Sequence, residues 1–166
     1  IDDTIGSAEK EIVPEAYKLI PESLDWLKIK YQKPIIYKSD RLELYYKYAE
    51  KIIDLGHAYV CTCPADVMRK NRAEGRECSC RNMTKEKNKE MWKKMFHMKE
   101  GQAILRIKTS MKHENPAFRD RVLFRISERN HPRVKKKHKV WPMLEFSWAV
   151  DDHALGITHV IRGKDL

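Results

Sequence analysis

Apolar residues at helical spacing open the chain. Pro14 stands where a helix accepts its first residue, because proline lacks the N–H that this position leaves unpaired. Ala16, Ile20 and Leu24 follow one helical turn apart, which predicts a helix. Pro21 falls inside this pattern and removes a backbone hydrogen bond. We therefore expect the helix to be kinked or split at Pro21.

A second and stronger helix is predicted from about residue 40. Asp40 is expected to cap its first turn, with Glu43 reaching back as the other half of a capping box. Gly56 is expected to end it, since glycine readily takes the left-handed conformation that follows many helices. The inward face is predicted to consist of apolar residues about one turn apart: Leu42, Tyr46, Ala49 and Ile53.

A third helix is predicted after residue 84, and the hydrophobic period then changes. Thr84 is expected to cap this helix and Gly101 to close it. Beyond Gly101, apolar and polar residues alternate over residues 103–108 and again over 122–126, which is typical of strands, and an Asn-Pro pair between them marks a turn. The apolar face of the third helix consists of Met91, Trp92, Met95 and Phe96.

The last part of the chain is predicted to be a helix followed by a strand. Residues 145–155 have a helical pattern that Gly156 ends, and residues 157–161 are expected to form a strand. A strand after a helix fits an α/β sheet, in which ligands bind beyond the carboxyl ends of the strands. Arg162 and Lys164 lie at that end, and Lys164 receives no role.

Composition and charge narrow the class of protein. With 35 % charged and 42 % apolar residues, the composition is that of a soluble globular protein. No apolar run approaches the ~20 residues of a membrane span, so we expect a cytoplasmic protein without a membrane partner. The net charge is +10, from 34 basic and 24 acidic residues, which indicates a nucleic-acid partner. A generally lysine-rich surface would give the same charge.

The cysteines form two tight pairs. Cys61 and Cys63 are followed, after fourteen residues with turn formers among them, by Cys78 and Cys80. Two Cys-x-Cys hooks can bring four thiolates to the corners of a tetrahedron, which suits structural Zn²⁺, although one residue rather than two separates the cysteines of each pair. Free thiols or two disulfides are the alternatives, and His57 is an alternative ligand. Such a closed site would stabilise a small loop-rich knuckle rather than catalyse.

Basic residues gather beside the cysteine pairs and in a later loop. A zinc-stiffened loop that carries arginine and lysine suits the phosphate groups of RNA, and so does the concentrated basic run over residues 133–139. Solvated basic loops would also explain both segments. The candidates for RNA contact are Arg69, Lys70, Arg72, Arg76, Arg133, Lys135, Lys136 and Lys137.

Several stretches resemble class I glutamyl- and glutaminyl-tRNA synthetases. The run over residues 141–163 resembles the later half-sheet of their catalytic domain, and residues 2–4, Asp-Asp-Thr, look like the acidic motif after their first nucleotide-binding helix. Residues 39–42 match as well, and residues 61–63, Cys-Thr-Cys, point to the archaeal branch. The resemblance covers essentially the whole chain.

The resemblance implies a fold and a division of the chain. The implied fold class is α/β: part of a Rossmann-type class I synthetase catalytic domain, with an α+β zinc-containing insertion that holds the acceptor end of tRNA. Residues 1–38 and 140–166 would belong to the two halves of the Rossmann-type domain. Residues 39–139 would form the acceptor-binding insertion with its zinc knuckle.

The resemblance also implies a reaction and its partners. The glutamate carboxylate would attack the α-phosphate of ATP, with Mg²⁺, and the glutamyl group would pass to the terminal adenosine of tRNA(Glu), with tRNA(Gln) as a further candidate. Asp2 matches the acidic position that holds the substrate's ammonium group. Arg162 stands where glutamyl enzymes have arginine, whose guanidinium pairs with the side-chain carboxylate. Charge-assisted hydrogen bonds of this kind discriminate against glutamine by roughly 10- to 100-fold.

Two positions depart from the family pattern. Leu144 stands where the family usually has a tyrosine that lines the amino-acid pocket, and leucine cannot donate a hydrogen bond. Trp148 stands where bacterial members have asparagine. We expect both as walls of the glutamate pocket, with the pocket's polar contacts supplied from elsewhere.

The sequence lacks the two signatures by which the family grips ATP, which are of the His-Ile-Gly-His and Lys-Met-Ser-Lys-Ser types. In the family these lie before the position of Asp2 and beyond that of Leu166. We therefore expect an excised middle part of the enzyme, with no catalytic residue of its own and no activity alone.

Three other functions fit the sequence less well than the glutamyl enzyme does. A glutaminyl-tRNA synthetase is disfavoured by Arg162. A non-catalytic, zinc-dependent RNA-binding module would leave Asp2 and Arg162 without a role. A relative that moves glutamate onto a modified tRNA base is disfavoured by the archaeal-type insertion.

Overall fold

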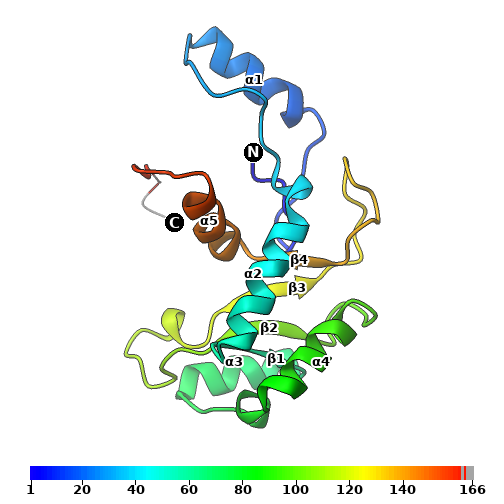
Figure 1. Ribbon diagram of the computed structural model, residues 1–166, viewed down its shortest axis with the longest axis vertical. Coiled ribbons are helices and arrows are strands. Elements are labelled where there is room, and N and C mark those ends of the chain that lie inside the picture. The colour runs from blue at the N-terminus through cyan, green and yellow to red at the C-terminus, as the bar shows by residue number, and fades with distance from the viewer. Residues whose placement is uncertain (162, 164–166) are drawn as a thin grey trace.

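A four-stranded antiparallel sheet forms the centre of the computed structural model, which describes residues 1–161 and 163 (Figure 1). Each strand pairs with the next one along the chain. Val60 stands opposite Leu105, and Leu105 stands opposite Phe124, so apolar side chains line one face across the sheet. The strands are β1 (Ala58–Cys61), β2 (Ile104–Ile107), β3 (Val122–Ile126) and β4 (Val140–Pro142).

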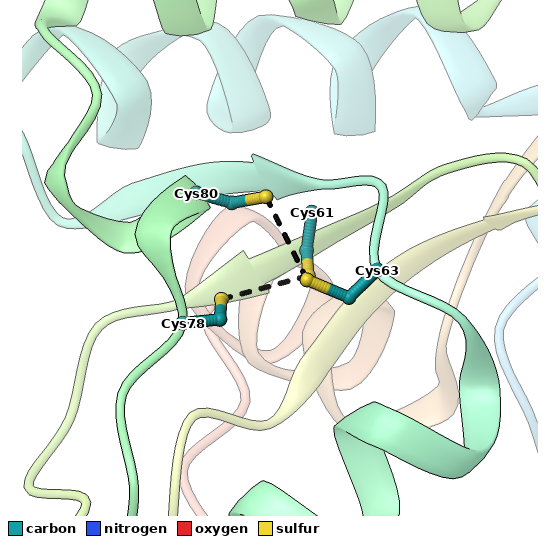
Figure 2. Close-up of side chains that lie close together, drawn as sticks. All are labelled: Cys61, Cys63, Cys78 and Cys80. Carbon is teal, nitrogen blue, oxygen red and sulfur yellow. Dashed lines mark hydrogen bonds between the residues drawn. The ribbon is translucent and has the colours of Figure 1, made fainter.

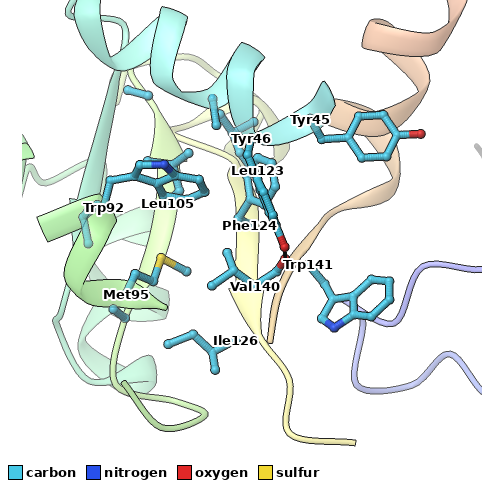
Figure 3. Packing of buried hydrophobic residues seen from close by; sticks show 14 of the residues in the cluster. Tyr45, Tyr46, Trp92, Met95, Leu105, Leu123, Phe124, Ile126, Val140 and Trp141 are labelled. Atoms are coloured by element: carbon cyan, nitrogen blue, oxygen red, sulfur yellow. Dashed lines mark hydrogen bonds between the residues drawn. The ribbon is translucent and has the colours of Figure 1, made fainter. Parts of the chain in front are cut away.

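Helices α2 (Leu42–Asp54) and α4 (Lys85–Met95) bury their apolar faces against that side of the sheet (Figure 3). The Trp92 and Phe124 rings meet edge to face with centroids 5.2 Å apart, a favoured aromatic geometry. The predicted inward residues of α2 are all buried, and so are Trp92 and Met95 of α4. The prediction that these residues form the buried faces of the two helices is therefore confirmed.

The opposite face of the sheet carries a second, smaller cluster. Tyr59, Cys61 and Ile104 are buried there, and Met68 packs against them. Met68 belongs to α3 (Ala65–Glu74), and the short 3₁₀ helix η2 (Ser79–Asn82) lies beside β1. The sequence reasoning assigned neither β1 nor α3, because both lie within or beside the segment interpreted only as a cysteine knuckle.

The predicted helix ends are partly confirmed. The Thr84 hydroxyl accepts a hydrogen bond from the Lys87 backbone N–H at 3.2 Å, as a capping residue does, and Gly56 takes a left-handed φ of 79° after α2. The capping box at Asp40 is wrong. Asp40 ends the 3₁₀ turn η1 (Lys38–Asp40), and its carboxylate pairs with Arg133 at 2.8 Å, so α2 begins after Arg41 without a side-chain cap.

Helix α1 (Ala16–Trp26) forms one continuous helix that includes Pro21. Of the two predicted outcomes, the split does not occur and the kink stays a prediction. None of its residues is buried, and Trp26 is 81 % exposed. A helix on the outside of the molecule needs few side-chain contacts to accommodate the proline ring. The 3₁₀ connection η3 (Pro116–Phe118) forms the predicted turn between β2 and β3, with the Asn115 side chain accepting from the Ala117 N–H at 2.9 Å.

Helix α5 (Leu144–Ala154) is confirmed, with Gly156 at a φ of 65° beyond its end. The predicted strand over residues 157–161 is wrong: this segment is irregular and exposed, with Ile161 97 % exposed. A strand forms only where a neighbouring strand accepts its hydrogen bonds, and among the described residues none lies beside this segment. The described fold is therefore mixed α/β with an antiparallel sheet, and the Rossmann-type halves remain proposals.

A buried carboxylate joins the start of the chain to the central body. Asp3 is 1 % exposed and accepts hydrogen bonds from the Ser39 N–H at 2.8 Å and the Ser39 hydroxyl at 2.7 Å. His131 is fully buried, and its Nε2 lies 2.7 Å from the Asp3 carbonyl oxygen. The residues around Asp2 are thereby fixed relative to both η1 and the loop before β4.

Candidate functional site

The four cysteines converge from two turns beside the sheet (Figure 2). Cys61 ends β1 and Cys63 lies shortly before α3, whereas Cys78 and Cys80 lie at the start of η2. Their sulfur atoms all lie within 4.8 Å of one another. The Sγ–Sγ distance is 3.8 Å for both Cys61–Cys78 and Cys63–Cys80.

These distances fit a tetrahedral metal site. Zinc binds thiolate sulfur at about 2.3 Å, which places two sulfurs of a tetrahedron about 3.8 Å apart. All four cysteines are free thiols, so the disulfide alternative is not realised in this structure. Burial raises the pKa of the Cys61 thiol to about 11, and a bound cation is what would favour its thiolate form. The cluster consists of cysteines alone, without His57, and it can hold a metal ion.

A buried carboxylate ties the second cysteine pair to the sheet. Asp120 is 1 % exposed, and its side chain accepts from the Tyr59 hydroxyl at 2.9 Å, Arg81 Nε at 2.9 Å and the Thr109 N–H at 2.7 Å. Arg81 directly follows Cys80, and its Nη2 also donates to the Thr109 carbonyl at 2.7 Å. The position of η2 therefore depends on Asp120.

An arginine-lined cavity of about 370 Å³ opens beside this site. Two of the predicted RNA contacts, Arg69 and Arg72 of α3, line it over an apolar wall that includes Met68 and Ile104. Arg72 Nε donates to the Pro116 carbonyl at 2.8 Å, which anchors α3 to η3. The arginines that line the cavity but were not predicted as RNA contacts are Arg106, Arg125 and Arg129.

The remaining predicted RNA contacts divide into exposed and partnered side chains. Lys70 is exposed on α3, and Arg76 pairs with Glu74 at 3.0 Å just beyond that helix. The three lysines of the later loop are exposed and follow one another in the sequence: Lys135, Lys136 and Lys137. These lysines can reach a polyanion without breaking internal contacts.

Arg133 is held differently from those lysines. Its Nη1 donates to the Ser39 hydroxyl at 2.8 Å and its Nη2 pairs with Asp40, while the guanidinium lies 3.9 Å from the Tyr37 ring centroid. These contacts give Arg133 a structural role, because they tie the loop before β4 to η1. A role in RNA binding stays a prediction for this residue.

Two of the predicted glutamate-pocket residues, Asp2 and Trp148, lie near Lys38. Lys38 is 6 % exposed; its Nζ lies 3.7 Å from an Asp2 carboxylate oxygen, donates to the Ser147 hydroxyl at 2.8 Å and lies 5.3 Å from the Trp148 ring centroid. Asp2 also pairs with Lys10 at 2.9 Å. Burial opposes ionisation of Asp2, but the charges of Lys38 and Lys10 outweigh it and lower its pKa.

Sequence reasoning missed Lys38. A lysine in a polar Lys-Ser-Asp turn is usually solvated, and no periodic pattern marks this one as buried. Leu144 begins α5 and is partly buried, four residues before Trp148 on the same helix. Arg162 and Lys164 lie outside the described residues.

The chain matches, over residues 1–166, the family described as "tRNA synthetases class I (E and Q), catalytic domain". It therefore belongs to this family, as its sequence predicts.

Among curated proteins, the chain is similar to archaeal glutamate–tRNA ligases. It is 49 % identical to that of Methanothermobacter marburgensis over 156 residues, covering 94 % of this chain and 28 % of the relative. For the ligase of Methanocaldococcus jannaschii the identity is 47 % over 156 residues, with the same coverage of 94 % and 28 %. The Thermoplasma acidophilum ligase is 49 % identical over 158 residues, covering 94 % and 29 %. The chain thus spans under a third of the length of these relatives.

The fold also resembles a solved structure. A glutamate tRNA ligase from Elizabethkingia meningosepticum, crystallised with its amino acid, aligns with a TM-score of 0.56 at 22 % identity, over 92 % of this chain and 34 % of that one. At this identity the likeness establishes the fold only. No helix in the described part of the chain has the length and apolar character to cross a membrane.

Proposed function

We propose that the chain forms part of a glutamate–tRNA ligase, contributing a wall of the glutamate pocket and a zinc-stabilised surface for the acceptor end of tRNA. The complete enzyme would convert glutamate and ATP, with Mg²⁺, to glutamyl-adenylate and pyrophosphate, and would then transfer the glutamyl group to the terminal adenosine of tRNA(Glu) with release of AMP. The family membership and the archaeal ligase relatives support this proposal. Charging of tRNA(Gln) and a glutaminyl specificity are the alternatives.

One observation carries the pocket assignment. Asp2 and Trp148 are far apart in the sequence, yet Lys38 contacts both, through an ion pair of 3.7 Å and a ring contact of 5.3 Å. The closeness of Asp2 and Trp148 to one side chain supports the pocket that the family resemblance implies. Asp2 would accept from the glutamate ammonium group, since an ionised carboxylate only accepts hydrogen bonds. Trp148 and Leu144 would pack against the substrate's methylene groups.

We further propose that the four cysteines hold structural Zn²⁺. Zinc would fix the segment around Cys63, from which α3 starts, and with it Arg69 and Arg72 on the cavity wall. Their guanidinium groups would contact RNA phosphates, and the loop lysines would add further contacts. Residues 39–139 would form this insertion and the flanking residues the Rossmann-type halves. The chain alone is expected to bind RNA without charging it.

Replacing the matching segment of the M. marburgensis ligase with this chain tests the function. The chimera, offered glutamate and glutamine with tRNA(Glu) and tRNA(Gln), is expected to charge glutamate onto tRNA(Glu). Activity on tRNA(Gln) would add that partner, and glutamine charging would replace the proposal with a glutaminyl enzyme. A folded, zinc-loaded chimera that charges neither amino acid would refute it.

Substitutions in the chimera test the pocket. Asp2→Asn is expected to lower kcat/KM for glutamate by roughly 10- to 100-fold, because one charge-assisted hydrogen bond is removed. Arg162→Gln is expected to lower it by about the same factor and to reduce the preference over glutamine. Asp25→Asn, at an exposed site on α1, is the matched control and should leave charging unchanged. Unchanged glutamate charging in both pocket variants would refute the site assignment.

A further inference from the structure

Arg106 is a buried cation on the sheet face that carries the cysteine cluster. It is 3 % exposed. On β2 it stands opposite Tyr59, and two residues earlier Ile104 stands opposite Cys61. Because alternate residues of a strand share a face, Arg106 lies on the same side of the sheet as Cys61. Burying a guanidinium is unfavourable unless an opposite charge or hydrogen bonds compensate it.

The contacts of Arg106 lead toward the cysteines. Its Nε donates to the Asp120 main-chain carbonyl at 2.9 Å, and its guanidinium carbon lies 5.5 Å from the Tyr59 ring centroid. Burial lowers the pKa of Arg106, but the neighbouring Tyr59, Cys61 and Asp120 side chains outweigh it and raise the pKa. Arg106 therefore lies near Cys61 on this face of the sheet.

Of the two arginines beside the cysteine cluster, Arg106 is the better placed to offset the negative charge of a zinc–thiolate site. Four thiolates around one Zn²⁺ leave two negative charges, which are unfavourable next to a buried strand unless cations offset them. Arg81 also lies beside the cluster, but it is already paired with Asp120 at 2.9 Å and with Glu77 at 3.1 Å. Arg106 instead donates to a main-chain carbonyl and lies beside an aromatic ring, and the Asp120 carboxylate acts on it without a direct ion pair, so part of its charge is available to the metal site.

We propose that Arg106 is a positioning residue of the metal site, which orients the Cys61 thiolate and offsets the negative charge of the zinc–tetrathiolate. The proposal rests on the zinc site proposed above. Residues that hydrogen-bond metal ligands typically change metal affinity by roughly 10- to 100-fold when they are replaced. Arg106 also lines the arginine-rich cavity, so a role in RNA binding alone is the competing explanation.

Zinc affinity of the 166-residue chain separates these explanations. Zinc would be titrated from the protein with a chromophoric chelator, for the wild type, Arg106→Met and Arg106→Gln. We expect both variants to bind zinc about 10- to 100-fold more weakly. Arg125→Met is the matched control, because Arg125 lines the same cavity from the neighbouring strand, and it should stay within about twofold of the wild type.

A spectroscopic measurement tests the contact with the ligand directly, and a second variant covers the case in which the first does not fold. Replacing zinc by Co²⁺ gives sulfur-to-cobalt charge-transfer bands, which should shift in Arg106→Gln if the guanidinium bonds a ligand thiolate. If Arg106→Met does not fold, Arg106→Gln, which keeps a donor for the Asp120 carbonyl, decides. Zinc affinity within twofold of the wild type in a folded Arg106 variant, with unchanged cobalt bands, would overturn the proposal. A wild-type chain that binds no zinc would instead overturn the metal site itself.

Discussion

Replacing Asp120 tests whether a single carboxylate anchors the cysteine knuckle to the sheet. Three donors converge on it: the Tyr59 hydroxyl, Arg81 Nε and the Thr109 N–H, all within 2.9 Å. Tyr59 is fully buried, so its hydroxyl has no access to solvent as a substitute acceptor. Asp120→Asn keeps the shape but leaves only one acceptor oxygen for the three donors, whereas Asp120→Ala removes every acceptor.

The structure sets the size of the expected effect. In the asparagine variant the NH₂ group must face either the Thr109 N–H or the Arg81 guanidinium, so at least one buried donor is left without an acceptor, which costs about 1–3 kcal/mol. The weakened bond to Arg81 brings the expected destabilisation to about 2–4 kcal/mol. Asp120→Ala also removes the buried partner of the Arg81 guanidinium, which keeps as an ion-pair partner only the half-exposed Glu77, so we expect this variant to cost about 3–5 kcal/mol.

Urea unfolding of the chain with zinc in excess measures these changes in stability. The Tyr59→Phe background provides a double-mutant cycle: Asp120→Ala should cost less there, with a coupling of about 0.5–3 kcal/mol, since one stranded donor is already absent. Asp25→Asn is the exposed control, expected within about 0.5 kcal/mol of the wild type. A destabilisation below about 1 kcal/mol for Asp120→Ala would refute the anchoring role.

Further predictions concern capping, RNA binding and acid stability. Thr84→Ala should destabilise the chain by about 1 kcal/mol in the same unfolding assay, since the variant has no side-chain cap on α4. Replacing the exposed loop lysines, Lys135, Lys136 and Lys137, by alanine should weaken RNA binding. The slope of log binding constant against log salt concentration should fall by about 1 for each lysine that pairs with a phosphate. An unchanged slope would place the RNA elsewhere. The pKa of Asp2 is lowered on folding, so its stabilisation is present above its unfolded pKa, near 3.8, and disappears as pH falls through the folded value. Asp2→Asn should therefore flatten the acid limb of a stability–pH curve, and an unchanged limb would contradict the ion pairs.

Helices were predictable where the hydrophobic period and the end signals agree. Thr84 and Gly56 sit at the ends of strongly periodic segments, and the structure places both as expected. The alternating strands β2 and β3 were predictable for the same reason. The cysteine spacing predicted a cluster of thiols, and the four sulfurs do converge.

The remaining features depend on partners that local patterns do not reveal. Aspartate is a typical helix-capping residue, but the Asp40 carboxylate forms a long-range ion pair with Arg133 instead of capping α2. Residues 157–161 had strand propensity, but a strand also needs a neighbour. Lys38 became buried because Asp2 and Ser147 converge on it from opposite ends of the chain, which no local pattern encodes.

The adjacent acids Asp2 and Asp3 connect the two proposed functions. Asp3 holds Ser39, whose hydroxyl also accepts from Arg133 in the loop that carries the lysines, so the loop is fixed to the start of the chain. Asp2, one residue earlier, faces Lys38 and the predicted glutamate pocket. A carboxylate buried as deeply as Asp3 leaves its neighbours little freedom, because moving it would break several hydrogen bonds at once. The position of the basic loop and the position of the proposed ammonium-binding carboxylate are therefore set by the same buried network.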